Sequence, residues 1–103
     1  MAFQYQININ PTGGSPRIAF NPNPLPANAL DQIFWTNNDS VAHWPGLLNG
    51  DGTVNQTFFI PNQIAPNGDT SAIFCPAVAP ATFRYVCSLH PDEKGVVGVI
   101  NVT

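Results

Sequence analysis

Charged side chains are scarce in this chain. They make up 9% of its 103 residues, well below the roughly 25% of an average soluble protein, so the surface must be polar through Asn, Gln, Thr and Ser. Three basic residues stand against six acidic ones, and the net charge of -3 offers no surface that would release counterions from nucleic acid or anionic lipid. Neither nucleic acid nor an anionic membrane surface is therefore an expected partner.

Long apolar runs are missing as well. No stretch approaches the roughly 18 residues that cross a bilayer. Residues 1–3 lead straight into a strand pattern, without the basic region and apolar region of a signal peptide. We expect no membrane span, and an exported protein would have a leader that is not part of this sequence.

The prolines and glycines leave little room for long helices. Eleven prolines and eight glycines are scattered along the chain without a period. Apolar residues make up 44% of the chain, which excludes a disordered segment, and 103 residues suffice for one hydrophobic core. The sequence predicts a single all-β domain that covers residues 1–103.

Short segments with a two-residue apolar period indicate seven or eight strands. The alternation is clearest in residues 3–9, and Ile33 and Trp35 should share one face of a later strand. Asn-Gly and Asp-Gly pairs in residues 46–55 predict a tight turn, and the prolines of residues 21–29 predict an extended or turning segment. This spacing is typical of a β-sandwich or a small barrel. The expected strands cover 3–9, 17–20, 30–38, 56–60, 70–75, 81–87 and 95–102.

Cys75 and Cys87 are the two cysteines of the chain, and one disulfide is the ordinary interpretation of such a pair in a small secreted sandwich. Both cysteines are expected on the inward faces of strands 70–75 and 81–87. If these strands form a hairpin with its turn close to Cys75, Cys87 lies farther up the ladder than the roughly 4.4–6.8 Å between Cα atoms that a disulfide requires. We therefore expect two thiols that are not bonded to each other, with the disulfide as the alternative.

The two histidines, His43 and His90, each lie in a turn-rich segment, "SVAHWPG" and "SLHPDEKG". A single loop histidine is usually a solvated polar residue. Together with Cys87, however, they provide one thiolate and two imidazoles, the trigonal ligand set that suits copper in an electron-transfer site. The two residues between Cys87 and His90 allow sulfur and ring nitrogen to converge on one ion, while His43 must arrive from a neighbouring strand end.

Two long segments of the chain resemble the cupredoxins, the blue-copper family that includes plastocyanin and amicyanin. "FNPNPLPANALDQIFWTNNDSVAHWP" (20–45) is similar to the family's segment around the first histidine ligand. "GDTSAIF" (68–74) and "ATFRYVCSLHP" (81–91) are similar to its Gly-Asp-Thr strand and its Cys-x-x-His-Pro loop. The resemblance implies a Greek-key β-sandwich of about eight strands, with type 1 copper at one end, in a periplasmic or extracellular protein. The equatorial copper ligands that it implies are His43, Cys87 and His90.

The resemblance breaks at the axial position. The amicyanin-like loop has the pattern Cys-x-x-His-Pro-x-Met-x-Gly, and residues 87–95 place Glu93 where that methionine would be, while the one methionine of the chain is Met1. Three interpretations compete: Glu93 binds copper, Glu93 faces solvent and the Ala42 backbone oxygen or nothing takes the axial place, or Val96 fills it as an apolar wall. We favour coordination by Glu93. A hard carboxylate donor would favour Cu(II), lower the reduction potential and shift the colour from blue toward green or red.

A second departure follows the first histidine, where relatives such as plastocyanin have an asparagine and this chain has Trp44 and Pro45. Trp44 either covers the metal or packs in the core, and we expect the core. Asn38 or Ser88 could donate hydrogen bonds to the sulfur of Cys87.

The expected function is one-electron transfer by a mononuclear copper protein. The exposed edge of His90, flanked by Leu89 and Pro91, would be the exit point for the electron, toward redox proteins that bind transiently to a monomer. The alternatives are a copper carrier or sensor, a copper site that reacts with a small molecule such as a nitrogen oxide, and a metal-free protein-binding sandwich with a Cys75–Cys87 disulfide. An enzyme is the least expected class, because no general acid, base or nucleophile pair is apparent.

Overall fold

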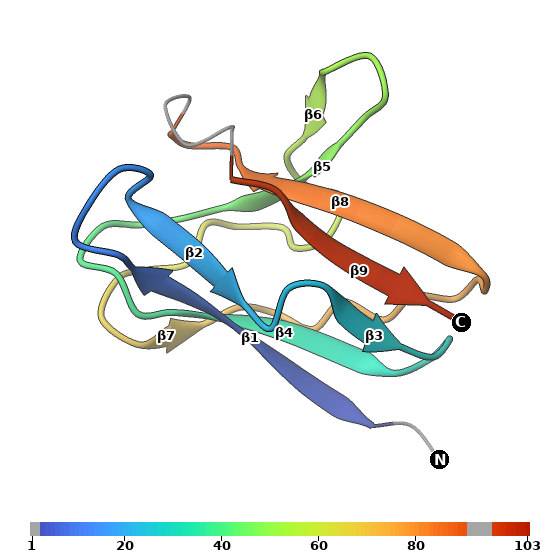
Figure 1. Ribbon diagram of the computed structural model, residues 1–103. Helices are drawn as coiled ribbons and strands as arrows, with labels where there is room; N and C mark the ends of the chain where they lie inside the picture. The colour runs from blue at the N-terminus through green and yellow to red at the C-terminus, as the bar shows by residue number, and fades with distance from the viewer. Residues whose placement is uncertain (1–2, 91–95) are drawn as a thin grey trace.

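The computed structural model describes residues 3–90 and 96–103, which form two β-sheets packed as a sandwich (Figure 1). The first sheet has the strand order β2-β1-β4-β7 and the second the order β3-β9-β8-β5-β6. The predicted all-β sandwich is confirmed, with nine strands in the described part of the chain. The strands of the first sheet are β1 (Gln4–Pro11), β2 (Ile18–Asn21), β4 (Gln32–Asn37) and β7 (Asp69–Thr70). Those of the second are β3 (Leu25–Ala27), β5 (Pro45–Leu48), β6 (Val54–Asn55), β8 (Ala81–Cys87) and β9 (Gly98–Val102).

Strand pairing brings distant parts of the sequence together. β1 runs parallel to β4, and β3 runs parallel to β9, while the other pairs are antiparallel. In the pair of β5 and β8, Pro45 lies opposite Cys87. The parallel strands β1 and β4 end on the same side of the sandwich (left in Figure 1). The end of β8 lies close to the segment that follows β4, because Cys87 contacts His43.

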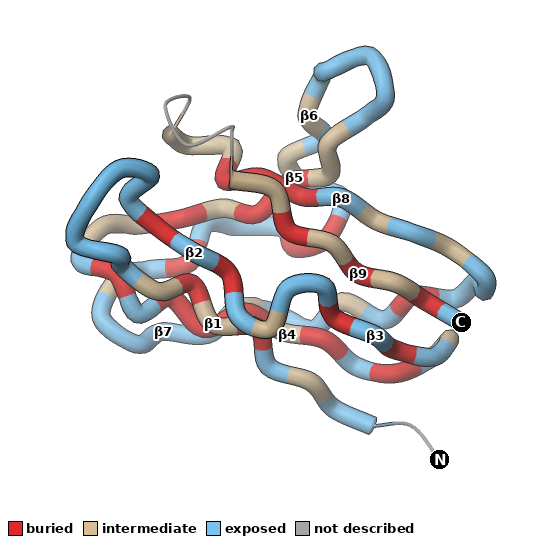
Figure 2. Tube along the Cα trace, viewed as in Figure 1, coloured by how far each residue is buried: buried red, intermediate tan, exposed pale blue. Residues whose placement is uncertain are grey.

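The core lies between the sheets, where the inward side chains of both meet. Buried positions alternate with more exposed ones along much of β1, β2 and β9, whereas β4 and β8 each end in three consecutive buried residues (Figure 2). Ile33 and Trp35 are both fully buried, as their spacing predicts. The ring of Tyr85 from the second sheet lies 4.7 Å from that of Phe20 and 5.4 Å from that of Trp35, measured between centroids, and these aromatic contacts join the layers.

Two of the predicted strands are wrong in extent or pairing. Residues 56–60 form turns rather than a strand, although Phe59 and Ile60 are buried, so their hydrophobicity indicates burial and not strand pairing. In the segment 70–75, Phe74 forms an isolated bridge to Ile33 of the first sheet instead of a hairpin with β8. This pairing reverses the expected inward face.

The reversal exposes Cys75. Ile73 is 44% exposed and Cys75 is exposed, whereas Phe74 between them packs against the core. No disulfide joins Cys75 to the buried Cys87 among the described residues. The prediction of two unlinked thiols is confirmed, but for a different reason, since the two cysteines are not on one hairpin.

The proline-rich segment 21–29 contains a strand that the sequence did not predict. β3 lies at the edge of its sheet, parallel to β9, with Pro26 exposed. A proline is tolerated there because an edge strand has one side without ladder partners.

The described residues include no helix that is long and apolar enough to cross a membrane.

Gly98 of β9 lies opposite Tyr85 of β8 and leaves room for its ring. A Cβ atom at Gly98 would collide with the ring and hydroxyl of Tyr85, which is fully buried and cannot turn aside. We predict that Gly98→Ala lowers the free energy of unfolding by about 1–3 kcal/mol, the usual cost of overpacking. Chemical denaturation measures this change.

Gly50→Ala is the matched control, because a Cβ atom there meets no atom within 4 Å. It should change the unfolding free energy by no more than about 0.5 kcal/mol. Equal effects of the two substitutions would contradict this account of the packing.

Candidate metal centre

Three side chains with metal-binding donors converge at one end of the sandwich. Nδ1 of His43 lies 3.1 Å from Sγ of Cys87, which lies 3.5 Å from Nδ1 of His90. The three donor atoms all lie within 4.8 Å of one another, and the two imidazole centroids are 4.9 Å apart. The structure therefore brings together His43, Cys87 and His90, as the sequence predicts.

The donor set fits one small metal ion. Metal–nitrogen bonds of about 2.0–2.1 Å and a metal–sulfur bond of about 2.3 Å place neighbouring donors roughly 3.3–4 Å apart. The nitrogen–sulfur distances of 3.1 and 3.5 Å are close to that range. Small movements of the side chains would therefore accommodate an ion between them.

The sandwich fixes the backbone of two of the three residues, Cys87 and His43. Cys87 is the last residue of β8 and is 1% exposed, because it continues the inward face that Tyr85 occupies. His43 exchanges two backbone hydrogen bonds with Ile64, at 3.2 and 2.8 Å. The Ser88 N–H donates to the Trp44 carbonyl at 2.9 Å, which joins the two ligand-bearing segments. His90 is half-buried, so one part of the centre reaches the surface.

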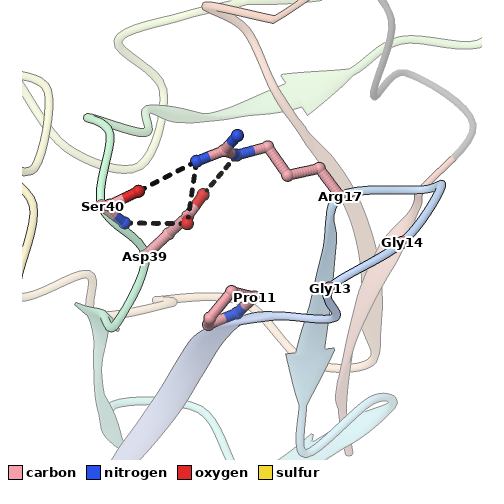
Figure 3. A pocket seen from close by; sticks show the side chains of 6 residues that line it. All are labelled: Pro11, Gly13, Gly14, Arg17, Asp39 and Ser40. Carbon is pink, nitrogen blue, oxygen red and sulfur yellow. Dashed lines mark hydrogen bonds and ion pairs between the residues drawn. The ribbon is translucent and has the colours of Figure 1, made fainter.

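A buried carboxylate contacts the far side of the His43 ring. Nε2 of His43 lies 2.8 Å from Oδ2 of Asp39, and both residues are almost completely buried. Arg17, from the loop that precedes β2, donates to both oxygens of Asp39 at 2.8 and 3.1 Å (Figure 3). Sequence reasoning missed both residues. The spacing of four residues from Asp39 to His43 was a signal for the first, but nothing in the sequence indicated Arg17.

The contacts of Asp39 favour its ionised form. Burial alone would raise the pKa of this carboxyl, but hydrogen bonds from Arg17, from His43 and from the Ser40 N–H outweigh that effect. Together they hold the pKa of Asp39 well below its ordinary value. A negative charge is therefore present beside His43 at neutral pH.

Asn37 organises the loop that carries Asp39 and His43. Its Oδ1 accepts a hydrogen bond from the Asp39 N–H at 3.0 Å. Its amide group lies 2.9 Å from the Val41 carbonyl oxygen and 3.2 Å from that of Ile64. Because Asn37 is fully buried, these bonds replace those that water would have made.

The predicted fourth ligand, Glu93, lies outside the described residues. Val96, which could form an apolar wall at the axial position, is half-buried and packs against the hydrophobic core. Ala42, whose backbone oxygen is the other candidate, is half-buried beside His43.

The side chains of Trp44, Asn38 and Ser88 form hydrogen bonds with neighbouring parts of the protein. Trp44 is half-buried, packs against the core and donates from its Nε1–H to the Ile60 carbonyl at 3.3 Å, in agreement with a core role. The amide of Asn38 donates to Asn8 and Asn10, away from the sulfur. The Ser88 hydroxyl donates to the Trp44 carbonyl at 2.9 Å, so it helps to hold the two segments together.

Comparison with known proteins identifies solved structures that have a similar fold. No protein-family model matches the chain, and no curated protein sequence does. Among solved structures, the novel purple cupredoxin from Nitrosopumilus maritimus is 24% identical, with a TM-score of 0.75 over 95% of this chain and 98% of that one. Amicyanin from Paracoccus versutus is 14% identical, with a TM-score of 0.67 over 99% of this chain and 81% of that one.

A third similar structure is the reduced Cu(I) form of an amicyanin mutant at pH 4. It is 12% identical, with a TM-score of 0.65 over 99% of this chain and 82% of that one. These likenesses show that the chain has the cupredoxin fold.

We predict that Asn37→Ala destabilises the protein by about 2–3 kcal/mol, because it leaves buried backbone groups around the His43 loop without their hydrogen bonds. Urea unfolding of the metal-free protein measures this loss. The control is Asn38→Ala, because Asn38 is the exposed neighbour and its substitution should cost no more than about 0.5 kcal/mol. A loss at Asn38 as large as that at Asn37 would contradict the assignment.

Proposed function

We propose that this protein binds one copper ion through His43, Cys87 and His90 and transfers single electrons. The observation that supports the proposal most strongly is the convergence of one thiol sulfur and two imidazole nitrogens within 4.8 Å. One thiolate and two imidazoles are the equatorial ligands of blue-copper electron-transfer sites. Bound copper would supply a centre that accepts and releases one electron.

The protein's own residues would keep this centre rigid. Cys87 lies at the end of a central strand. The N–H and the carbonyl group of His43 are both hydrogen-bonded to the backbone of Ile64. Ligands that the fold holds in place do not have to be assembled around the ion, and they move little when its charge changes. This rigidity suits electron transfer better than metal delivery.

His90 gives the centre its proposed contact with partners. His90 is half-buried, so part of this residue reaches the surface, where an imidazole edge would face a docking protein. With only nine charged residues in the chain, we propose redox partners that bind weakly and transiently through a small patch. We further propose that the protein acts as a monomer in the periplasm or outside the cell, as an electron carrier rather than an enzyme.

We also propose Glu93 as the fourth ligand. It occupies the sequence position at which the amicyanin-like loop has its axial methionine, six residues after Cys87. An oxygen donor there would stabilise Cu(II) relative to Cu(I) and would make the geometry more tetragonal.

Addition of one equivalent of Cu(II) to the reduced protein should produce an intense visible band, because Cys87 thiolate would donate charge to the ion. Cys87→Ser should abolish this band completely. Cys75→Ser is the matched control, because Cys75 is exposed and Cys87 is buried, and it should retain the full band. Absorption and electron paramagnetic resonance spectra measure both outcomes. A band that survives Cys87→Ser, or none in the wild type, would refute the proposed centre.

Voltammetry distinguishes electron transfer from copper transport. A reversible one-electron couple, with copper retained in the presence of a chelator, is the result expected of an electron carrier. Release of copper to the chelator, without a reversible couple, would instead establish a carrier or sensor.

Replacement of Glu93 tests the fourth ligand. If the carboxylate binds, Glu93→Met should move the thiolate band and the resonance spectrum toward those of a blue site and should raise the reduction potential. Glu93→Gln should cause a smaller change of the same sign, since a neutral amide oxygen is a weaker donor. Identical spectra in all three proteins would exclude Glu93 as a ligand and leave the three-residue site intact.

A further inference from the structure

We infer that Asp39, held in place by Arg17, is a positioning residue that fixes the tautomer of His43 and thereby presents Nδ1 to the metal. This inference deepens the proposed function, since its effect on copper rests on that function. Its effect on the ring is a property of the metal-free protein and can be measured separately.

Four hydrogen-bonding atoms contact Asp39, two at each of its oxygens. Oδ2 lies 2.8 Å from Nε2 of His43 and 2.8 Å from Nε of Arg17. Oδ1 accepts from the Ser40 N–H at 2.8 Å and from Nη2 of Arg17 at 3.1 Å. An ionised carboxylate can only accept hydrogen bonds, so the His43 partner must be an N–H group.

That requirement decides which nitrogen of His43 can bind a metal. A neutral imidazole carries one proton, and if Nε2 holds it, Nδ1 has the lone pair. Nδ1 is the nitrogen that lies 3.1 Å from the sulfur of Cys87. The Asp39 contact therefore directs the lone pair of His43 toward the position where the three donors meet.

Arg17 compensates the charge of the buried Asp39 carboxylate. Asp39 is 3% exposed, and an isolated carboxylate at that depth would be strongly disfavoured. The side chain of Arg17 is 47% exposed and its guanidinium remains charged, so Arg17 compensates the buried anion while its side chain stays in contact with water. It also donates to the Ser40 hydroxyl at 3.1 Å, which keeps the loop beside β2 (Figure 3).

The charge of Asp39 should also affect the metal. A carboxylate bonded to the outer nitrogen of a ligating histidine makes the ring a stronger donor, and the loss of such a partner typically weakens metal binding 10- to 100-fold. The negative charge would favour Cu(II) over Cu(I). Asp39 would thus lower the reduction potential without touching the metal.

The first test uses the metal-free, reduced wild-type protein. Nitrogen-15 NMR of the histidine rings should show His43 protonated at Nε2 and unprotonated at Nδ1. In Asp39→Asn, whose amide can donate as well as accept, the preference for this tautomer should weaken or reverse. A wild-type ring protonated at Nδ1 would overturn the inference, whatever the outcome of any copper experiment.

The second test measures the affinity for Cu(II) and the reduction potential of the copper-loaded protein. Asp39→Asn should weaken Cu(II) binding about 10- to 100-fold, consistent with other carboxylate–histidine partners, and should raise the reduction potential. Arg17→Gln should shift both quantities in the same direction. Asp69→Asn is the matched control, because it removes the same charge from an exposed residue.

If Asp39→Asn and Asp69→Asn give equal affinities, potentials and His43 tautomers, the positioning role is wrong. If the wild type binds no copper but His43 has the expected tautomer and loses it in Asp39→Asn, the proposed copper function fails while the positioning of the ring stands.

Discussion

The antiparallel pairing of β5 with β8 is the constraint on which the candidate centre depends. It places Pro45 opposite Cys87, so the histidine two residues before β5 must lie beside the sulfur at the end of β8. The bond from the Ser88 N–H to the Trp44 carbonyl continues this connection beyond the ladder. Backbone hydrogen bonds of the sandwich, rather than the ion, therefore bring the two buried donors together.

Around this pairing, the protein buries polar groups and provides each with partners. Asn37 and Asp39 lie in a region where unsatisfied groups would be costly, yet their oxygens and amide hydrogens are bonded to the loop, to His43 and to Arg17. Such a network restricts the loop to one conformation. Much of the precision of the centre thus comes from residues that do not face the donor cluster.

The sequence predicted the sandwich from local signals, and it predicted the three converging residues from short motifs together with the resemblance to the cupredoxins. Apolar alternation indicates strands, and Cys87 and His90 lie in one short motif. The failures have physical reasons. Residues 70–75 pair with the first sheet instead of with β8, which alternation cannot indicate. Arg17, just before β2, reaches Asp39, just after β4, although β1 lies between these two strands in the sheet. Contacts of this kind depend on how the layers are assembled, so no local pattern encodes them.

The exposed sulfur of Cys75 has a practical consequence for attachment of the protein to surfaces. Cys75 follows Phe74, which bridges Ile33 near the beginning of β4, whereas the donor cluster lies beyond the end of that strand. A thiol-reactive linker or a gold surface would meet this sulfur first, because Cys87 is shielded from solvent. Molecules tethered in this way would form an oriented layer with His90 directed outward.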